Sequence, residues 1–418
     1  MEPRLADLEI ATFAVDEVVE GTQTGWSDGR LTLALPQLAV GAGDPALAEA
    51  TVEVVRPGDS VRISNVLDVA LPSARIGGAL PSARFEESLP SARIDDVRVH
   101  RLAGVAVLTV CDWAGAGFEG AEELPDSLVD MAGPGADRSP WGATTHVVVR
   151  CVPAPGVEVA EADRAVRDAA TSVATTIAEA TGGATPDDVR TIGPMPPADA
   201  TLPAIAAILQ VASEGPLVDT FLDGEPLGEF APRVFDERLL HEGRLTNGAY
   251  DWPGVRNVTA AYQDLALLRK LRAAHGERSR YIGLILAPGY LDGADQKRRA
   301  AEASAELAAG LGADGVVCTT FSSGNSHTDT MLTVQACERR GIGTVALVCE
   351  TNGGLTDHVP EADCLVSTGN EDELVDAWTP ERVVGGDDRA RVGERVPAVH
   401  YLGGLAETGD ARWTAMPA

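Results

Sequence analysis

The second half of the chain alternates short apolar runs with helical patterns, and this alternation restricts the possible folds more than any other feature. From about residue 255, the runs "YIGLILA", "DGVVCTT", "GTVALVCE" and "DCLVST" predict strands, and stretches such as "GADQKRRAAEASAELAAGLG" between them predict helices. Apolar strands joined by helices form parallel sheets that are covered on both faces. We therefore expect a doubly wound, Rossmann-like α/β domain over residues 241–371.

The first half is dominated by strand patterns. Apolar runs such as "ATVEVVRPGDSVRI" and "TTHVVVRCV" lie between turns rich in Gly, Pro and Asp. The stretch "EVAEADRAVRDAATSVATTIAEATGG" predicts one long amphipathic helix closed by Gly. "LPAIAAILQVASEGPLVDTFLDG" predicts a strand, a loop and then a helix. Residues 1–240 are thus expected to form a β-rich region, which makes the chain α/β in class and α+β overall, with a C-terminal tail of open role over 372–418.

A repeat with a period of nine lies within residues 71–97. Its three units are "LPSARIGGA", "LPSARFEES" and "LPSARIDDV". Three nonapeptides could form turns of a β-solenoid, but a Pro in every unit favours an extended, stiffened surface arm. Such a basic arm could also clasp an acidic partner subunit.

Charge and cysteine usage limit the class of protein. The chain has 418 residues and a formal net charge of −30, which disfavours binding to nucleic acid or anionic membranes. No apolar run reaches membrane-spanning length, the N-terminus is acidic and lacks a targeting pattern, and the six cysteines form no CxxC pair. These features predict a cytoplasmic protein without disulfides.

Ligands of open parallel sheets bind beyond the carboxyl ends of the strands. In this chain those ends carry "APGY", "TTFSSGNSHTD", "CETNGG" and "STGN", which are rich in small and polar residues or hold a Pro-Gly turn. The helix after Asn325 adds a positive dipole end, with Thr328 or Asp329 as the expected cap. These turns could also be no more than good turns. The candidate substrate- or partner-binding residues here are Thr320, Ser323, Gly324, Asn325, His327, Asp329, Glu350 and Asn352.

Sequence motifs for several common sites are missing. No GxGxxG follows a strand and no GxxxxGK[ST] occurs, so neither a dinucleotide site nor a P-loop is predicted. His327 and Asp329 could share a proton or bind a metal, but no zinc-ligand spacing accompanies them, and we predict no metal. A GxSxG elbow for serine hydrolysis is also missing.

The stretch "LTNGAYDWPG", residues 245–254, separates the two halves. Its Asn247-Gly248 pair predicts a tight turn with positive φ at both residues. Pro253-Gly254 predicts a second turn. On these signals alone the stretch is a connector.

Four blocks carry a resemblance to a known family. They are "VEVVRPGDSVRI", "DMAGPGADRSPWGATTHVVV", "RKLRAAHG" and "SSGNSHTDTMLTVQACERRGIGTVALV". From the N-terminus to about residue 371, the sequence resembles the pyruvoyl-precursor subunit of component B of the glycine, sarcosine and betaine reductases, and more distantly the D-proline reductase proprotein. The block "GPGAD" adds Gly133, Gly135 and Asp137 to the candidate binding residues.

The resemblance implies a reaction and a partner. In that family an amine is reductively cleaved from the carbon next to a carboxylate. The subunit is made as a proprotein that cuts itself at a Cys, which becomes a pyruvoyl group, and the ketone forms a Schiff base with the substrate. A thiol or selenol of a partner subunit then displaces the amine, so we expect a hetero-oligomer with a homologue of that subunit.

The processing residue is replaced in this chain. The family motif Gly-Asn-Cys aligns with Gly248, Ala249 and Tyr250, and a tyrosine side chain can neither attack the preceding carbonyl nor leave from Cβ. No Cys lies between Cys151 and Cys318, and no Ser between Ser213 and Ser279. Thr246 and Thr259 are the nearest hydroxyl residues and would give a ketobutyryl group. We therefore expect no processing and no pyruvoyl cofactor.

Three functions are compatible with these observations. In the first, the unprocessed chain is a subunit of a reductase complex that cleaves a small substrate, with Tyr250 or Asp251 polarising it or donating a proton. In the second, it is a non-catalytic scaffold or binding subunit of such a complex. In the third, it is a stand-alone nucleotide-binding protein.

Overall fold

A computed structural model describes most of the chain. It covers residues 7–76, 97–113, 117, 126–321, 324–351, 363–386, 389–409 and 413–416. Residues 77–96, which hold most of the LPSAR repeat, lie outside the described residues, as do the candidate site residues Ser323 and Asn352.

The N-terminal half is built from small sheets, as the strand patterns predict. The first sheet has the order β13 (Asp188–Ile192), β1 (Leu8–Ala14), β9 (Val97–Ala103) and β8 (Ser73–Ile76). The second has the order β5 (Leu47–Val55), β12 (Thr145–Pro153), β10 (Val105–Cys111) and β7 (Val66–Ala70). The third has the order β11 (Leu128–Asp130), β6 (Val61–Ser64) and β24 (Arg382–Val384). A smaller sheet joins β2 (Glu17–Glu20), β4 (Arg30–Leu33) and β3 (Gly25–Ser27), followed by α1 (Leu35–Gly41). The first LPSAR unit supplies β8, which pairs with β9, so this part of the repeat is a sheet strand rather than a free arm.

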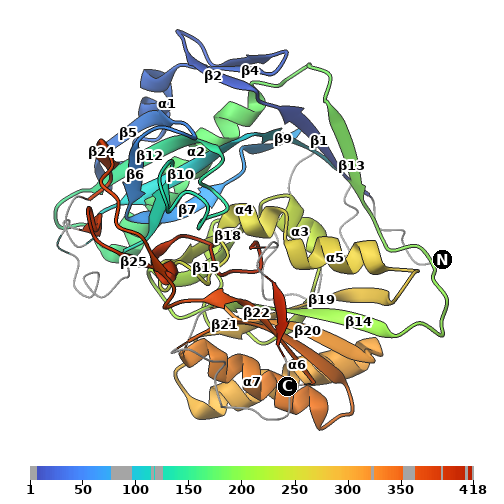
Figure 1. Cartoon of the computed structure of the whole chain (residues 1–418). Helices are drawn as coiled ribbons and strands as arrows, with labels where there is room; N and C mark the ends of the chain where they lie inside the picture. The colour runs from blue at the N-terminus through green and yellow to red at the C-terminus, as the bar shows by residue number, and fades with distance from the viewer. Residues whose placement is uncertain are drawn as a thin grey trace.

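The predicted long helix is α2 (Val159–Glu179). Its buried face is made largely of small residues, among them Ala162, Ala165 and Ala169, with Val166 and Ile177 between them. Alanines let the helix axis come close to a sheet. α2 packs on β10 and β12, and this contact forms the largest N-terminal core (Figure 1).

A seven-stranded sheet forms the centre of the C-terminal half. Its order is β17 (Arg233–Phe235), β19 (Arg280–Gly289), β14 (Ala204–Ala212), β20 (Gly315–Thr319), β21 (Gly343–Glu350), β22 (Cys364–Asn370) and β26 (Thr414–Met416). The five inner strands are parallel, as predicted, and the edge strands β17 and β26 run antiparallel to their neighbours. A boundary at residue 240 would cut through this sheet, because β14 pairs with both β19 and β20.

Helices cover both faces of this sheet, as Figure 1 shows. On one face, α6 (Ala294–Leu311) and α7 (Asn325–Glu338) bury Ala305, Met331 and Val334 against the strands. On the other face, α3 (Glu237–His241), α4 (Thr259–Gln263) and α5 (Ala266–Ala274) enclose a Leu-rich core.

Three local predictions were wrong. The segment after β14 forms strand β15 (Val218–Leu222), not a helix. β15 pairs with β16 (Glu225–Pro226) and with β18 (Leu245–Ala249), so Asn247 and Gly248 are strand residues and neither has positive φ. Gly248 is needed for packing, because a Cβ there would lie 2.5 Å from the Phe221 ring.

The third wrong prediction is the cap of α7. The helix begins at Asn325 after Gly324, and Asp329 lies inside it. The second predicted turn is correct, since Val255 N–H bonds to the Trp252 carbonyl across Pro253-Gly254.

The C-terminal segment is an integral part of the fold. β24 joins β6, and β23 (Leu374–Val375) pairs with β25 (Val396–Pro397). A fully buried ion pair fixes the segment: the Arg62 guanidinium contacts Asp130 at 2.6 Å and also donates to the carbonyls of Ala390 and Arg391. Tyr401 O–H donates to the same carboxylate at 3.2 Å.

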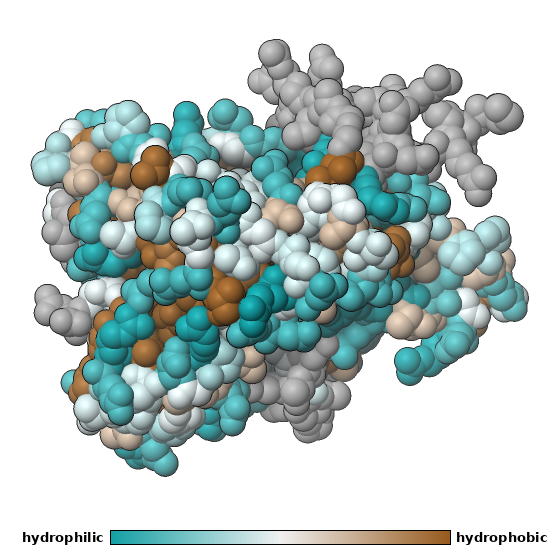
Figure 2. All heavy atoms as spheres, turned by 90° about the horizontal axis from the view of Figure 1, so that it is seen from above, coloured by the Kyte–Doolittle hydropathy of each residue, from teal (hydrophilic) through white to brown (hydrophobic). Residues whose placement is uncertain are grey.

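The surface agrees with the acidic composition. The face in Figure 2 is largely hydrophilic, with one band of apolar side chains across it. Within the described part of the chain, no helix has the length and apolarity to cross a membrane.

Candidate functional site

The chain order of the parallel strands places the topological switch point of the sheet between β14 and β20, and we call the region beyond the carboxyl ends of these two strands the crevice. β14 comes first in the chain, the second strand (β19) lies on one side of it and the third (β20) on the other. At such a reversal, the connections leave the sheet on opposite sides, and ligands bind beyond the carboxyl ends. We call the carboxyl ends of β19, β14, β20, β21 and β22, with the loops that follow them, the carboxyl edge.

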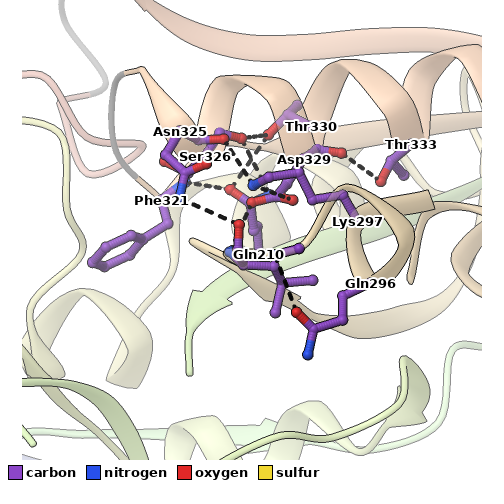
Figure 3. A network of polar contacts seen from close by, with 11 residues as sticks. Gln210, Gln296, Lys297, Phe321, Asn325, Ser326, Asp329, Thr330 and Thr333 are labelled. Carbon is purple, nitrogen blue, oxygen red and sulfur yellow. Dashed lines mark hydrogen bonds and ion pairs between the residues drawn. The ribbon is translucent and has the colours of Figure 1, made fainter. Parts of the chain in front are cut away.

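Gln210 of β14 fills the bottom of this crevice. Its amide oxygen accepts the Phe321 N–H at 2.9 Å, and its amide nitrogen lies 3.4 Å from the Ser326 carbonyl (Figure 3). Its own N–H donates to Thr319 Oγ1 at 2.9 Å. Protein groups therefore occupy the deepest part of the crevice, and a ligand would bind above Gln210.

The Asn325 and Asp329 side chains tie three elements together. Lys297 of α6 donates to Asp329 Oδ1 at 2.9 Å, and the Leu291 N–H donates to Asp329 Oδ2 at 3.2 Å (Figure 3). Asn325 Nδ2 donates to the Leu291 carbonyl at 3.3 Å. These two predicted binding residues fix the loop after β19, and the α7 N-terminus after Gly324 has no side-chain cap.

His327 and Asp329 do not share a proton. Two residues separated by two positions on a helix point in different directions. The His327 ring nitrogen Nε2 lies 3.8 Å from Cys349 Sγ, and both side chains are buried. Burial raises the pKa of the Cys349 thiol, so it is protonated at neutral pH. No cluster of metal-ligating residues exists in the described ranges.

The 249–254 stretch lies on the carboxyl edge. Ala249 packs with Ala212 after β14 and with Phe321 after β20, and Tyr290 at the end of β19 lies against them. The structure thus brings together the two regions that the sequence marked separately. The stretch is a wall of the crevice and not only a connector.

Tyr250 points away from this edge into the N-terminal core. Only 2% of its surface is exposed, its ring stacks on Trp113, and its O–H donates to Asp163 of α2 at 2.9 Å. Burial and the nearby Asp163 carboxylate raise the pKa of Tyr250. Arg167 lies 3.4 Å from Asp163 on the next turn of α2. The phenol is fully used in structure and does not face a substrate in the crevice.

Asp251 belongs to an acidic group that sequence reasoning missed. The partly exposed Asp251 accepts a hydrogen bond from the Tyr290 hydroxyl, and burial raises the pKa of Asp251. Glu214 and Asp292 lie close enough to Tyr290 to affect its titration. Burial and a hydrogen bond with Asp292 raise the pKa of Glu214 to about 7. The group can hold a transferable proton at neutral pH. The segment "APGY" at the end of a predicted strand could have indicated Tyr290 as a site residue. Glu214 and Asp292 belong to no sequence motif that would have indicated them.

The remaining predicted residues lie outside the crevice. Gly135 must be glycine, since a Cβ would lie 2.0 Å from Asp130 Oδ2, and a Cβ at Gly133 would meet the Trp378 ring. Asp137 is exposed on the same loop. This loop therefore packs on the C-terminal segment and not on the crevice. Glu350 accepts a hydrogen bond from Ser367 Oγ.

Residues 398–407, which we call the strap, connect the loop that carries Gly133, Gly135 and Asp137 to the carboxyl edge. The strap bonds to the 253–254 turn in both directions: Gly254 N–H donates to the Val399 carbonyl and Gly403 N–H to the Pro253 carbonyl, each at 2.9 Å. The Glu407 carboxylate accepts from the side chain of Asn257 and from the N–H of Thr320. The strap had no predicted role, yet it fixes the position of the 249–254 stretch.

Comparisons with known proteins show which family the sequence belongs to. The sequence model of the family described as "Glycine/sarcosine/betaine reductase component B subunits" matches residues 6–396, beyond the end of the resemblance at about residue 371. The chain is 26% identical over 390 residues to the glycine reductase complex component B subunits alpha and beta of Acetoanaerobium sticklandii, covering 90% of this chain and 88% of that protein. It is 26% identical over 390 residues to the sarcosine reductase complex component B subunit alpha of Peptoclostridium acidaminophilum, with 90% and 89% covered.

The betaine reductase complex component B subunit alpha of the same organism is 27% identical over 386 residues, covering 88% of this chain and 85% of that protein. No solved structure matches the chain. Since the family match spans nearly the whole sequence, the chain belongs to the glycine/sarcosine/betaine reductase component B family.

Proposed function

We propose that the chain acts without processing, as a pyruvoyl-free subunit of a reductase complex that cleaves a small substrate together with a thiol- or selenol-bearing partner subunit. The observation that carries this proposal is the environment of Tyr250. The resemblance aligns it with the processing Cys, and its hydroxyl is bound to Asp163 inside the core. No nucleophile is available there to cut the chain.

The carboxyl edge supplies what such a reaction needs from this subunit. The substrate binds above Gln210, between the 249–254 stretch and the end of β19. The partner thiolate attacks the substrate carbon, the carbon–heteroatom bond breaks, and the Asp251–Tyr290 pair or the neighbouring Glu214 protonates the leaving group. The electrons come from the partner thiol or selenol. Tyr250 anchors the 249–254 stretch in the N-terminal core, and its hydroxyl does not donate a proton to the substrate.

Two measurements test this proposal. Intact-mass analysis of the purified chain is expected to give one species of full length, and treatment with a carbonyl reagent is expected to leave that mass unchanged. Two fragments, one of them reactive with the reagent at its N-terminus, would show that the chain is processed after all.

Catalytic participation is tested in the reconstituted complex. We expect Asp251→Asn to lower kcat at least about tenfold, as removal of a proton donor does, and Tyr250→Phe to leave kcat nearly unchanged. The chain purified alone and the chain purified together with the neighbouring gene product are the two samples whose turnover is compared.

The buried phenol and the occupied crevice bottom also favour a second function, that of a non-catalytic scaffold. In that case the complex forms, but Asp251→Asn and Glu214→Gln leave turnover unchanged. If both variants turned over substrate as fast as the wild-type complex, the scaffold function would therefore be favoured over the catalytic one.

A further inference from the structure

A hollow of about 390 Å³ opens beside the seven-stranded sheet, at the β19 side of the carboxyl edge. It lies between α6, the end of β19 and the segment that leads into β17. Its walls are mainly apolar and come from Phe230, Pro232, Pro288, Leu291, Ala300 and Ala303. This volume falls within the range of small-molecule sites, and its size suits a single ring or a short aliphatic chain.

Two polar features stand at its rim. Gln296 Nε2 donates to Glu229 Oε1 at 2.9 Å, which joins α6 to the opposite wall. Arg299, one turn further along α6, also lines the hollow and is exposed. Among the residues that the structure describes, Arg299 makes no ion pair. Arg299 therefore places an exposed positive charge beside the apolar wall of the hollow.

The hollow is separate from the crevice. In Figure 3, Gln296 points away from the Lys297–Asp329 pair, although the two side chains are neighbours on α6. Leu291 lines the hollow and also bonds to the Lys297–Asp329 pair, through its N–H to Asp329. A ligand can therefore bind here without contacting Gln210 or the 249–254 stretch.

We propose that this hollow binds a small apolar monocarboxylate, with the ring or chain against Phe230 and Leu291 and the carboxylate on Arg299. A planar guanidinium matches a carboxylate through two parallel hydrogen bonds. The Glu229 carboxylate at the rim repels anions of higher charge such as phosphates. The proposal does not depend on the reaction proposed above.

Binding of 4-fluorobenzoate to the full chain, followed by ¹⁹F NMR, tests this site. We expect saturable binding, and about fivefold weaker binding of the neutral isostere 4-fluorobenzyl alcohol, because one exposed charge-assisted pair is lost. Arg299→Gln is expected to weaken benzoate binding by a similar factor. It should leave binding of the alcohol unchanged.

Matched variants on the same helix serve as controls. Arg298 is exposed and paired with Asp295, so Arg298→Gln should not change binding. Ala303→Phe fills the hollow and should abolish binding, whereas Ala309→Phe, at an exposed position of the same helix, should not. A thermal melt of each variant confirms that it is folded. The proposal would be overturned if the wild type did not bind 4-fluorobenzoate. It would also be overturned if the folded variants Ala303→Phe and Arg299→Gln bound it as tightly as the wild type.

Discussion

At the residue scale, Tyr250, which the resemblance aligns with the processing Cys of the family, is held in the core by its hydroxyl and its ring. Its hydroxyl donates to Asp163, which also lies near Arg167 and bonds to the backbone of Leu217, and its ring stacks on Trp113. Tyr250→Phe should lower the free energy of unfolding by about 2 kcal/mol, because a hydrogen bond to a buried charged group is lost. Urea denaturation measures this loss.

Tyr281→Phe is the matched control for Tyr250→Phe, since that buried hydroxyl lies 3.5 Å from Glu237 and makes a weaker bond. In the Asp163→Asn background, Tyr250→Phe should cost markedly less than in the wild type. An equal loss in both backgrounds would mean that the Tyr250–Asp163 bond contributes nothing.

Glu407 predicts a pH dependence of stability. Burial raises the pKa of this carboxyl to about 7 in the folded chain, against about 4.3 in an unfolded chain. The folded state therefore binds the proton more tightly, and this contribution is complete below about pH 4 and lost as pH rises through about 7. The loss amounts to roughly 4 kcal/mol.

Glu407→Gln keeps one oxygen that can accept from Asn257 but cannot ionise, and it should remove this pH dependence. Urea denaturation from pH 4.5 to 8 measures the difference between variant and wild type. His146 and His241, whose pKa values burial lowers to about 4, act in the opposite direction in both proteins and cancel in that difference. The exposed Glu277→Gln is the control, and a Glu407→Gln curve parallel to the wild type would refute the assignment.

At the scale of elements, sequence patterns located most strands but not their long-range partners. The buried runs that became β19, β20, β21 and β22 were readable because both faces of each strand are covered. "LTNGA" was misread because an Asn-Gly pair is a local turn signal, while pairing of β18 with β15 is decided by a segment more than twenty residues earlier.

The site shows the same division. The rule for strand ends placed Thr320 and Asp329 correctly on the carboxyl edge, and the resemblance added the 249–251 stretch. Contacts between distant segments left no local pattern: Glu407 meets Asn257 across 150 residues, and Tyr401 meets Arg62 across 339. Such pairs are visible only in the folded chain.

The Arg62–Asp130 pair holds the C-terminal segment on β6 and β11. Arg62→Met leaves Asp130 buried without its partner and should destabilise the chain by roughly 3–5 kcal/mol. In hydrogen-exchange mass spectrometry, peptides from residues 389–405 should exchange earlier than those of β14. Arg382→Met, which removes an exposed pair with Glu53, should change neither. Uniformly faster exchange over the whole chain would argue against a local role for the pair.

At the scale of the whole molecule, the strap makes hydrogen bonds to both halves of the chain. It bonds to Leu128 of the N-terminal half through Leu402, and to the 253–254 turn and the end of β22 through Val399 and Gly403. The family match ends at residue 396, just before it. The halves of this chain are therefore expected to unfold together only when the strap is present.

Two truncations separate the strap from the residues after it. A chain ending at Arg395 lacks Tyr401, Leu402 and Leu405, all nearly fully buried, and should lose on the order of 5 kcal/mol or more, with circular dichroism and tryptophan fluorescence no longer giving coincident transitions. A chain ending at Gly409 keeps the strap. Among the described residues it lacks Trp413, which packs on the Leu-rich core, and the three-residue edge strand β26, and it should lose clearly less stability than the chain that ends at Arg395. If both truncations lowered stability equally and kept a single transition, the coupling would lie elsewhere. The direct contacts of Tyr250 with α2 and of Arg256 with the carbonyls of Val66 and Leu67 would then be sufficient to join the halves.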